Sequence, residues 1–234
     1  MSFFTSLGIL LLAMVILFFL QLGPGTFAIF YHSALANFSR KRADDLSLSF
    51  ILGQEAFTAL AFLATFMIAS FSFQEPNFFV TDILPCIIAG LFVALAVFIA
   101  IFYFRPGASD MRLFVPRRFV ASLMQNTKKA RNRSDCIMLG FITAGLESFF
   151  TIPLYLAVSL VIINFPILTS NLIIIIGVLI AALPLFIIRC FYVLGNNLAE
   201  IERLRIRYRN LIRLILVVSY LSIAALIILN KAQS

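Results

Sequence analysis

Six long apolar runs constrain the fold of this chain more than any other feature of its sequence. Each run is long enough to cross the roughly 30 Å of hydrocarbon in a bilayer as a helix. The runs fall at about 4–22, 46–71, 82–104, 136–163, 167–192 and 210–229. Because 62% of the residues are hydrophobic and only 12% are charged, little sequence remains for a soluble domain. We therefore predict an all-α membrane protein in which six transmembrane helices form a single domain over residues 1–234.

Basic residues are confined to alternate connections between these runs. The loops 23–45, 105–135 and 193–209, with the residues that flank the last loop, hold all of the 18 Lys and Arg except Lys231. Since Lys and Arg remain cytoplasmic, these loops are predicted to be inside and to meet anionic lipids at the inner face. Six spans then put both termini outside. This topology explains the net charge of +8 without nucleic acid, and we expect a multi-pass protein of a bacterial or archaeal inner membrane.

Cysteine and histidine usage excludes several classes of site. Cys86, Cys136 and Cys190 are widely separated and form no CxxC motif, and His32 is the single histidine. Zinc centres, paired haem ligands and disulfide frameworks all need more of these residues. The sequence also shows no phosphate-binding glycine loop and no nucleophile motif. We predict no metal, no cofactor and no enzymatic activity.

One pattern occurs twice and places a carboxylate inside an apolar run each time. The first copy is Arg40-x-Arg42-Ala43-Asp44 leading to Gly53-x-Glu55, and the second is Arg131-x-Arg133-Ser134-Asp135 leading to Gly145-x-Glu147. Both glutamates would lie at similar depth, roughly 15–18 Å into the membrane. A charge at that depth is costly, and desolvation favours the neutral carboxyl group. Glu55 and Glu147 are therefore candidates for binding a proton or a cationic substrate, and the alternative is a protonated, hydrogen-bonded structural role.

The surroundings of Glu147 are the more polar of the two. Gly140, Thr143, Glu147 and Thr151 recur at helical spacing and form one narrow face of small and polar residues. Such faces suit close packing and hydrogen bonding between helices, and they direct a carboxylate away from lipid. We add Thr143 and Thr151 to the candidate site, and Glu147 is the stronger candidate of the two glutamates.

Acidic residues beside the basic loops have two interpretations. Asp44, Asp45 and Asp135 are expected at the cytoplasmic ends of spans, where a carboxylate can cap a helix N-terminus. The alternative is a gating ion pair with Arg42 or Arg133.

The triplet Gly23, Pro24 and Gly25 interrupts an apolar stretch that is too long for one unbroken span. Proline removes a backbone donor and glycine loosens a helix, so irregular backbone at membrane depth becomes possible here if protein or a wet cavity covers it. A simple kink, or an interfacial helix at 26–39, is the alternative.

This layout resembles the lysine-exporter (LysE-type) superfamily. The likeness lies in six spans, Gly23-Pro24 at the end of the first, a basic turn, a glycine-containing second span, and Gly140-Phe141-Ile142 with Pro153 in the fourth. The resemblance implies an exporter of small solutes such as amino acids or ions, built as two inverted three-helix repeats. An Asn-Pro pair expected in the fourth span of the amino-acid branch is absent, which leaves the substrate open.

Two functional hypotheses follow from the sequence. The first is a proton-coupled secondary exporter of a small polar or cationic solute, with Glu55 and Glu147 near the midplane. The second is a non-catalytic integral subunit of a larger membrane complex, held by its basic loops and apolar faces. Partners beyond the bilayer are accordingly the solute or ion itself, further copies of the chain, or other membrane subunits.

Overall fold

The computed structural model describes residues 3–22, 39–74, 83–103, 132–193 and 198–233. Its helices are α1 (Phe3–Leu22), α3 (Arg40–Gln74), α4 (Leu84–Tyr103), α6 (Arg133–Ile162), α7 (Ile167–Val193) and α8 (Leu198–Gln233). All six are long and apolar enough to cross a membrane, and the described part of the chain contains no strand. The prediction of an all-helical chain with six helices of this kind is confirmed.

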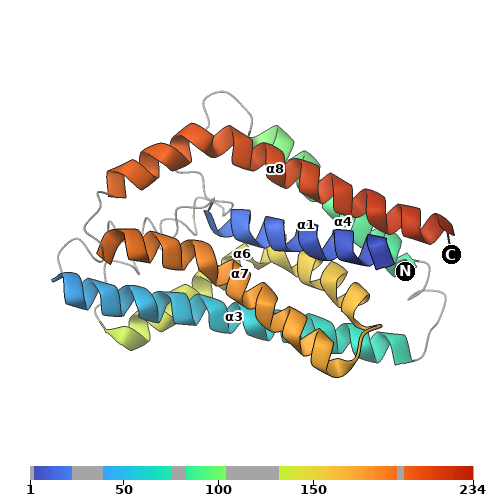
Figure 1. Ribbon diagram of the computed structural model, residues 1–234, viewed down its shortest axis with the longest axis horizontal. Coiled ribbons are helices and arrows are strands. Elements are labelled where there is room, and N and C mark those ends of the chain that lie inside the picture. The colour runs from blue at the N-terminus through green and yellow to red at the C-terminus, as the bar shows by residue number, and fades with distance from the viewer. Residues whose placement is uncertain (1–2, 23–38, 75–82, 104–131, 194–197, 234) are drawn as a thin grey trace.

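The helices run back and forth along one long direction. Figure 1 shows the start of α1 and the end of α8 at one end of the molecule, and the starts of α3, α6 and α8 at the other end. Because α3 and α6 both begin with basic residues, including Lys41 and Arg133, these basic helix starts lie at the end opposite the termini. This is the arrangement that six alternating spans with charged loops on one side require.

A short turn between α6 and α7 shows how one of these reversals is made. The Ser170 hydroxyl donates a hydrogen bond of 2.7 Å to the carbonyl of Ile162, the last residue of α6. The Phe165 N–H also donates to that carbonyl, at 3.0 Å. These bonds satisfy a helix-end acceptor that would otherwise be left without a partner in an apolar setting.

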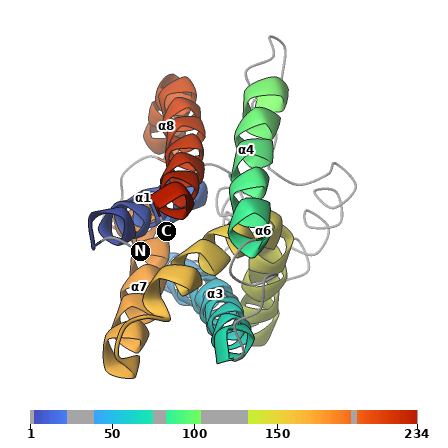
Figure 2. The same ribbon diagram turned by 90° about the vertical axis from the view of Figure 1, so that its right-hand side faces the viewer.

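Helix α6 lies in the middle of the bundle. It contacts α1, α3, α4 and α7, and Figure 2, seen from the end that holds the termini, shows α4 and α8 on one side of it and α3 and α7 on the other. The core around it includes the fully buried rings of Phe62, Phe92, Tyr155 and Tyr220. Most side chains on α6 are therefore buried, and the exposed ones, such as Met138 and Phe149, lie on its outer face.

Two glycines let α3 and α6 lie in backbone contact. A Cβ atom at Gly53 would overlap the carbonyl oxygen of Ile137, and one at Gly140 would overlap the carbonyl oxygen of Phe50. Small residues permit this approach, which supplies the dense packing that holds helices together in lipid. Because no side chain larger than hydrogen fits at either position, these two glycines allow the backbones of α3 and α6 to touch.

The two helices that carry the repeated pattern run in the same direction. Arg133 meets Asp45 near the start of both helices, and Tyr155 meets Phe62 further along both. The repeated pattern therefore relates two parallel neighbours. The division of the chain into two inverted three-helix repeats stays a prediction.

Candidate functional site

The structure brings the two predicted membrane carboxylates together. Glu55 on α3 and Glu147 on α6 lie close enough for their charges to interact. Glu147 exposes 6% of its surface, and both carboxylate oxygens of Glu55 are buried with no hydrogen-bond partner among the described residues. The parallel, glycine-mediated contact of α3 and α6 explains the proximity, since residues near Gly53 and Gly140 reach the same level of the bundle.

Three hydroxyl groups connect the surroundings of these carboxylates. The Tyr155 hydroxyl interacts with the hydroxyls of Thr58 on α3 and Thr151 on α6, and it lies within electrostatic range of both glutamates. Its ring stacks on Phe62 with a centroid distance of 4.9 Å. Tyr155 thus joins the polar faces of both helices, and its stacked ring holds the hydroxyl in place.

Tyr155 and Thr58 were not predicted as site residues, although the sequence holds a signal for each. Tyr155 continues the four-residue spacing of Thr143, Glu147 and Thr151, and Thr58 lies one turn after Glu55. Aromatic residues in membrane spans usually pack against lipid or other helices, so Tyr155 attracted no functional interpretation. The neighbouring helix supplies the evidence that the sequence lacked.

Thr143, one of the predicted site residues, satisfies its hydroxyl inside its own helix. Its Oγ1 donates a hydrogen bond of 2.8 Å to the carbonyl of Leu139, and the residue is 1% exposed. Serine and threonine often bond in this way to the preceding turn of a membrane helix. Thr143 therefore lies on the predicted face, but its hydroxyl donates within α6, whereas the Thr151 hydroxyl interacts with Tyr155.

A pair of glutamines extends the polar region toward α1. The Gln54 side-chain amide donates from Nε2 to the side-chain Oε1 atom of Gln21 at 2.5 Å, and Gln54 is 1% exposed. Among the residues that the structure describes, the buried Gln54 Oε1 atom has no partner, and neither carboxylate oxygen of its neighbour Glu55 has one. Three acceptor atoms on adjacent residues of α3 thus find no donor in the described part of the chain, and a buried acceptor without a donor is unfavourable. A proton or a group that carries N–H donors would complete them.

Two ion pairs fasten the basic end of α3 to its neighbours. Asp44 accepts two hydrogen bonds from Arg189 of α7, at 2.7 and 3.0 Å, and Asp45 accepts one from Arg133 of α6 at 2.6 Å. The first pair is partly buried and bidentate, while Arg133 leaves 71% of its side chain exposed. Arg189 was not predicted, because a basic residue at this end is already explained by topology.

The predicted caps differ between the two helices. The Asn132 N–H donates to the Asp135 carboxylate at 3.4 Å, so Asp135 does lie at the start of α6 as a capping residue. Asp44 does not cap α3, because that helix begins at Arg40 and Asp44 binds Arg189 instead. Arg42 is exposed in the first turn of α3.

The remaining predicted features lie elsewhere. The helix break predicted at Gly23, Pro24 and Gly25 is outside the described residues. Within the described ranges, no group of three or more His, Cys, Asp or Glu side chains could hold a metal ion. Searches against protein-family models, curated proteins and solved structures give no match to this chain.

Proposed function

We propose that the chain is a secondary transporter that exports a small polar or cationic solute in exchange for protons. The observation that carries this proposal is the buried pair of Glu55 and Glu147, in which both Glu55 oxygens have no donor among the described residues. Ionisable groups inside a membrane are expensive and commonly mark ion or proton pathways. A purely structural role would be expected to leave the Glu55 carboxyl group hydrogen-bonded by its neighbours.

The chemistry of the pair suits an exchange mechanism. Two ionised carboxylates in a medium of low dielectric constant repel each other and lose their hydration, so an empty site favours uptake of a proton. A cationic solute would neutralise the same charges. Proton and solute therefore compete for Glu55 and Glu147, and this competition is the minimum requirement for coupling an outward flux of solute to an inward flux of protons.

The neighbouring groups would orient either ligand. Thr58, Thr151 and Tyr155 supply hydroxyls that can donate to a carboxylate or accept from an ammonium group. Gln54 offers a further acceptor beside Glu55. The resemblance to LysE-type exporters supports the outward direction and a small solute, and a primary ammonium compound would supply N–H donors to these acceptors.

Flux measurements on the pure chain test the proposal. We would load proteoliposomes with lysine or methylammonium, impose a pH gradient, and follow solute efflux together with internal pH. Glu147→Gln and Glu55→Gln are each expected to lower proton-coupled efflux at least tenfold. Asp45→Asn is the matched control, because it also neutralises one carboxylate of α3 but at the exposed basic end.

Two results would contradict the proposal. Efflux that remains unchanged in both glutamine variants would remove the site from the mechanism. A pure chain that shows no flux of either probe, together with a second protein that co-purifies in mild detergent at a fixed ratio, would favour the non-catalytic subunit of a larger complex.

A further inference from the structure

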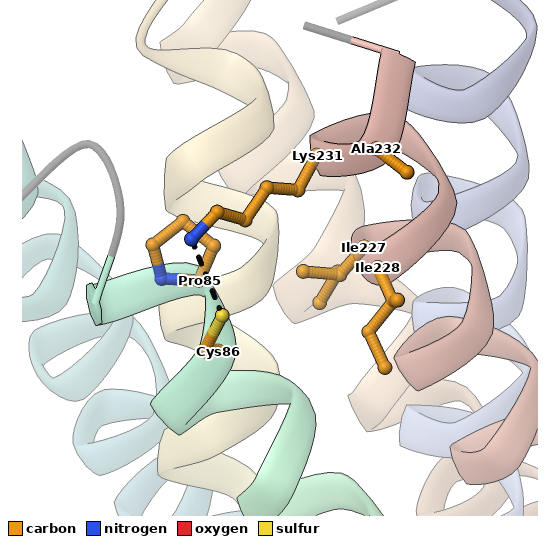
Figure 3. A pocket seen from close by; sticks show the side chains of 6 residues that line it. All are labelled: Pro85, Cys86, Ile227, Ile228, Lys231 and Ala232. Carbon is orange, nitrogen blue, oxygen red and sulfur yellow. Dashed lines mark hydrogen bonds between the residues drawn. The ribbon is translucent and has the colours of Figure 1, made fainter.

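A cavity of about 300 Å³ lies far from the carboxylates, where the start of α4 meets the end of α8. Figure 3 shows its lining, and Figure 1 shows that the start of α4 and the end of α8 lie at the end of the molecule that holds both termini. The lining residues are Pro85 and Cys86 of α4 and Ile227, Ile228, Lys231 and Ala232 of α8. Its volume is at the lower end of the roughly 300–1,000 Å³ that ligand pockets occupy.

The walls of this cavity are aliphatic and continue into the outer surface of both helices. Ile228 is 54% exposed, and Ile87 and Leu91 on α4 also expose large parts of their side chains. Because α4 and α8 are membrane-spanning by length and composition, this surface faces lipid. The bilayer itself therefore supplies the molecule that fills the cavity, and an acyl chain matches its walls.

A single cation reaches across the mouth of the cavity. The Lys231 side chain extends from α8 toward α4, where its Nζ atom lies 3.4 Å from Cys86 Sγ (Figure 3). Lys231 is in the last turn of α8, a position that favours a positive charge. It is also the only Lys or Arg of the sequence outside the three basic segments. An apolar groove with one cation at its end is complementary to an amphipathic anion.

We propose that this cavity binds an anionic phospholipid of the leaflet at the end that holds the termini. The phosphate would contact the Lys231 ammonium group, and an acyl chain would lie along Ile227 and Ile228. The depth agrees with this assignment, because Lys231 and Cys86 lie at helix ends, where headgroups meet the hydrocarbon. The site is independent of the carboxylate pair and of any transport that the pair supports.

Cys86 provides a local readout for the test, because its thiol lines the cavity. Cys136 is buried, so a Cys190→Ser background leaves Cys86 as the one exposed cysteine of the chain. We would measure the rate of N-ethylmaleimide labelling in nanodiscs of pure phosphatidylcholine and in nanodiscs with phosphatidylglycerol of the same acyl chains. The headgroup should shield the thiol, so labelling is expected to be about fivefold slower with phosphatidylglycerol, the factor that one surface lysine contributes.

Two variants separate this site from a general effect of surface charge. Lys231→Gln should bring the ratio of the two labelling rates close to one. Lys41→Gln removes the same charge from an exposed residue at the opposite end and should leave the ratio as in the parent. An unchanged ratio in Lys231→Gln, or an equal loss in both variants, would overturn the proposal. Retention of the effect in Lys231→Arg would show that a cation at this position suffices.

Discussion

Two helix pairs in this molecule pack in opposite ways. The α3–α6 pair meets through Gly53 and Gly140 and encloses carboxylates and hydroxyls. The α4–α8 pair meets through bulky apolar and aromatic groups, with the Phe92 and Tyr220 rings 5.6 Å apart. Among the contacts described between α4 and α8, the polar one joins Lys231 and Cys86 at the helix ends. Polar side chains thus lie in the middle of the α3–α6 contact, whereas the polar contact between α4 and α8 lies at the ends of these helices.

The difference shows what the proposed site requires of the two helices that form it. Bulky apolar side chains can fill the space between any two membrane helices, and they leave the backbones far apart. Bringing two carboxylates on separate helices within electrostatic range requires a closer approach, which only small residues permit. The glycines of α3 and α6 therefore serve the position of Glu55 and Glu147 as well as stability.

The two helix pairs should differ most in the stability change that follows when a glycine of each pair is replaced by alanine. Gly140→Ala places a Cβ on the Phe50 carbonyl oxygen and must push α3 away from α6, so we expect a loss of about 3 kcal/mol in stability. Gly90→Ala on α4 meets no atom within 4 Å and should be neutral or stabilise by about 0.5 kcal/mol. Thermal unfolding in a mild detergent measures both.

Proton-coupled efflux of the same two variants tests whether the α3–α6 contact also positions the carboxylates. Gly140→Ala should also lower efflux in proteoliposomes, because separation of the helices separates Glu55 from Glu147. Gly90→Ala should transport like the parent. Equal stability of the two variants would show that the α3–α6 contact is looser than the structure indicates.

A second test compares two buried tyrosines, one in each region. Tyr155→Phe removes the hydroxyl that joins Thr58 and Thr151 beside the carboxylates, and Tyr220→Phe removes a hydroxyl that donates to the Phe150 carbonyl at 3.3 Å. Each substitution deletes one hydrogen-bonding group and should cost about 1 kcal/mol in stability. Only Tyr155→Phe should reduce proton-coupled efflux, by about tenfold, and equal flux in both variants would separate Tyr155 from the site.

The helices were predictable from sequence because apolar length alone determines whether a segment can span a membrane. Their ends were less so. Helix α3 begins at Arg40, well before the apolar window at 46, since helical backbone continues into water until a breaker stops it. Hydropathy detects where the hydrocarbon ends, whereas hydrogen bonding determines where the helix ends.

The site was predictable in part. Glu55 and Glu147 could be identified because a carboxylate in an apolar run is costly and therefore conspicuous. Their proximity could not, since a sequence does not specify which of six helices are neighbours. Arg189 was overlooked for the same reason, because its partner Asp44 lies 145 residues away in the sequence.

The smallest expected difference is between the two ion pairs at the basic end of α3. Asp44 and Arg189 form a bidentate, partly buried pair, so a double-mutant cycle with Asp44→Asn and Arg189→Gln should give a coupling of about 1 kcal/mol. The exposed pair of Asp45 and Arg133 should show no measurable coupling, because solvent screens it and its side chains lose conformational freedom. Raising the salt concentration should weaken the first pair only slightly.

If the pair of Asp44 and Arg189 also opens and closes a passage at this end, Asp44→Asn should change the rate of efflux while the affinity for solute at Glu55 and Glu147 stays constant. An unchanged rate of efflux would instead make this pair a purely structural contact between α3 and α7.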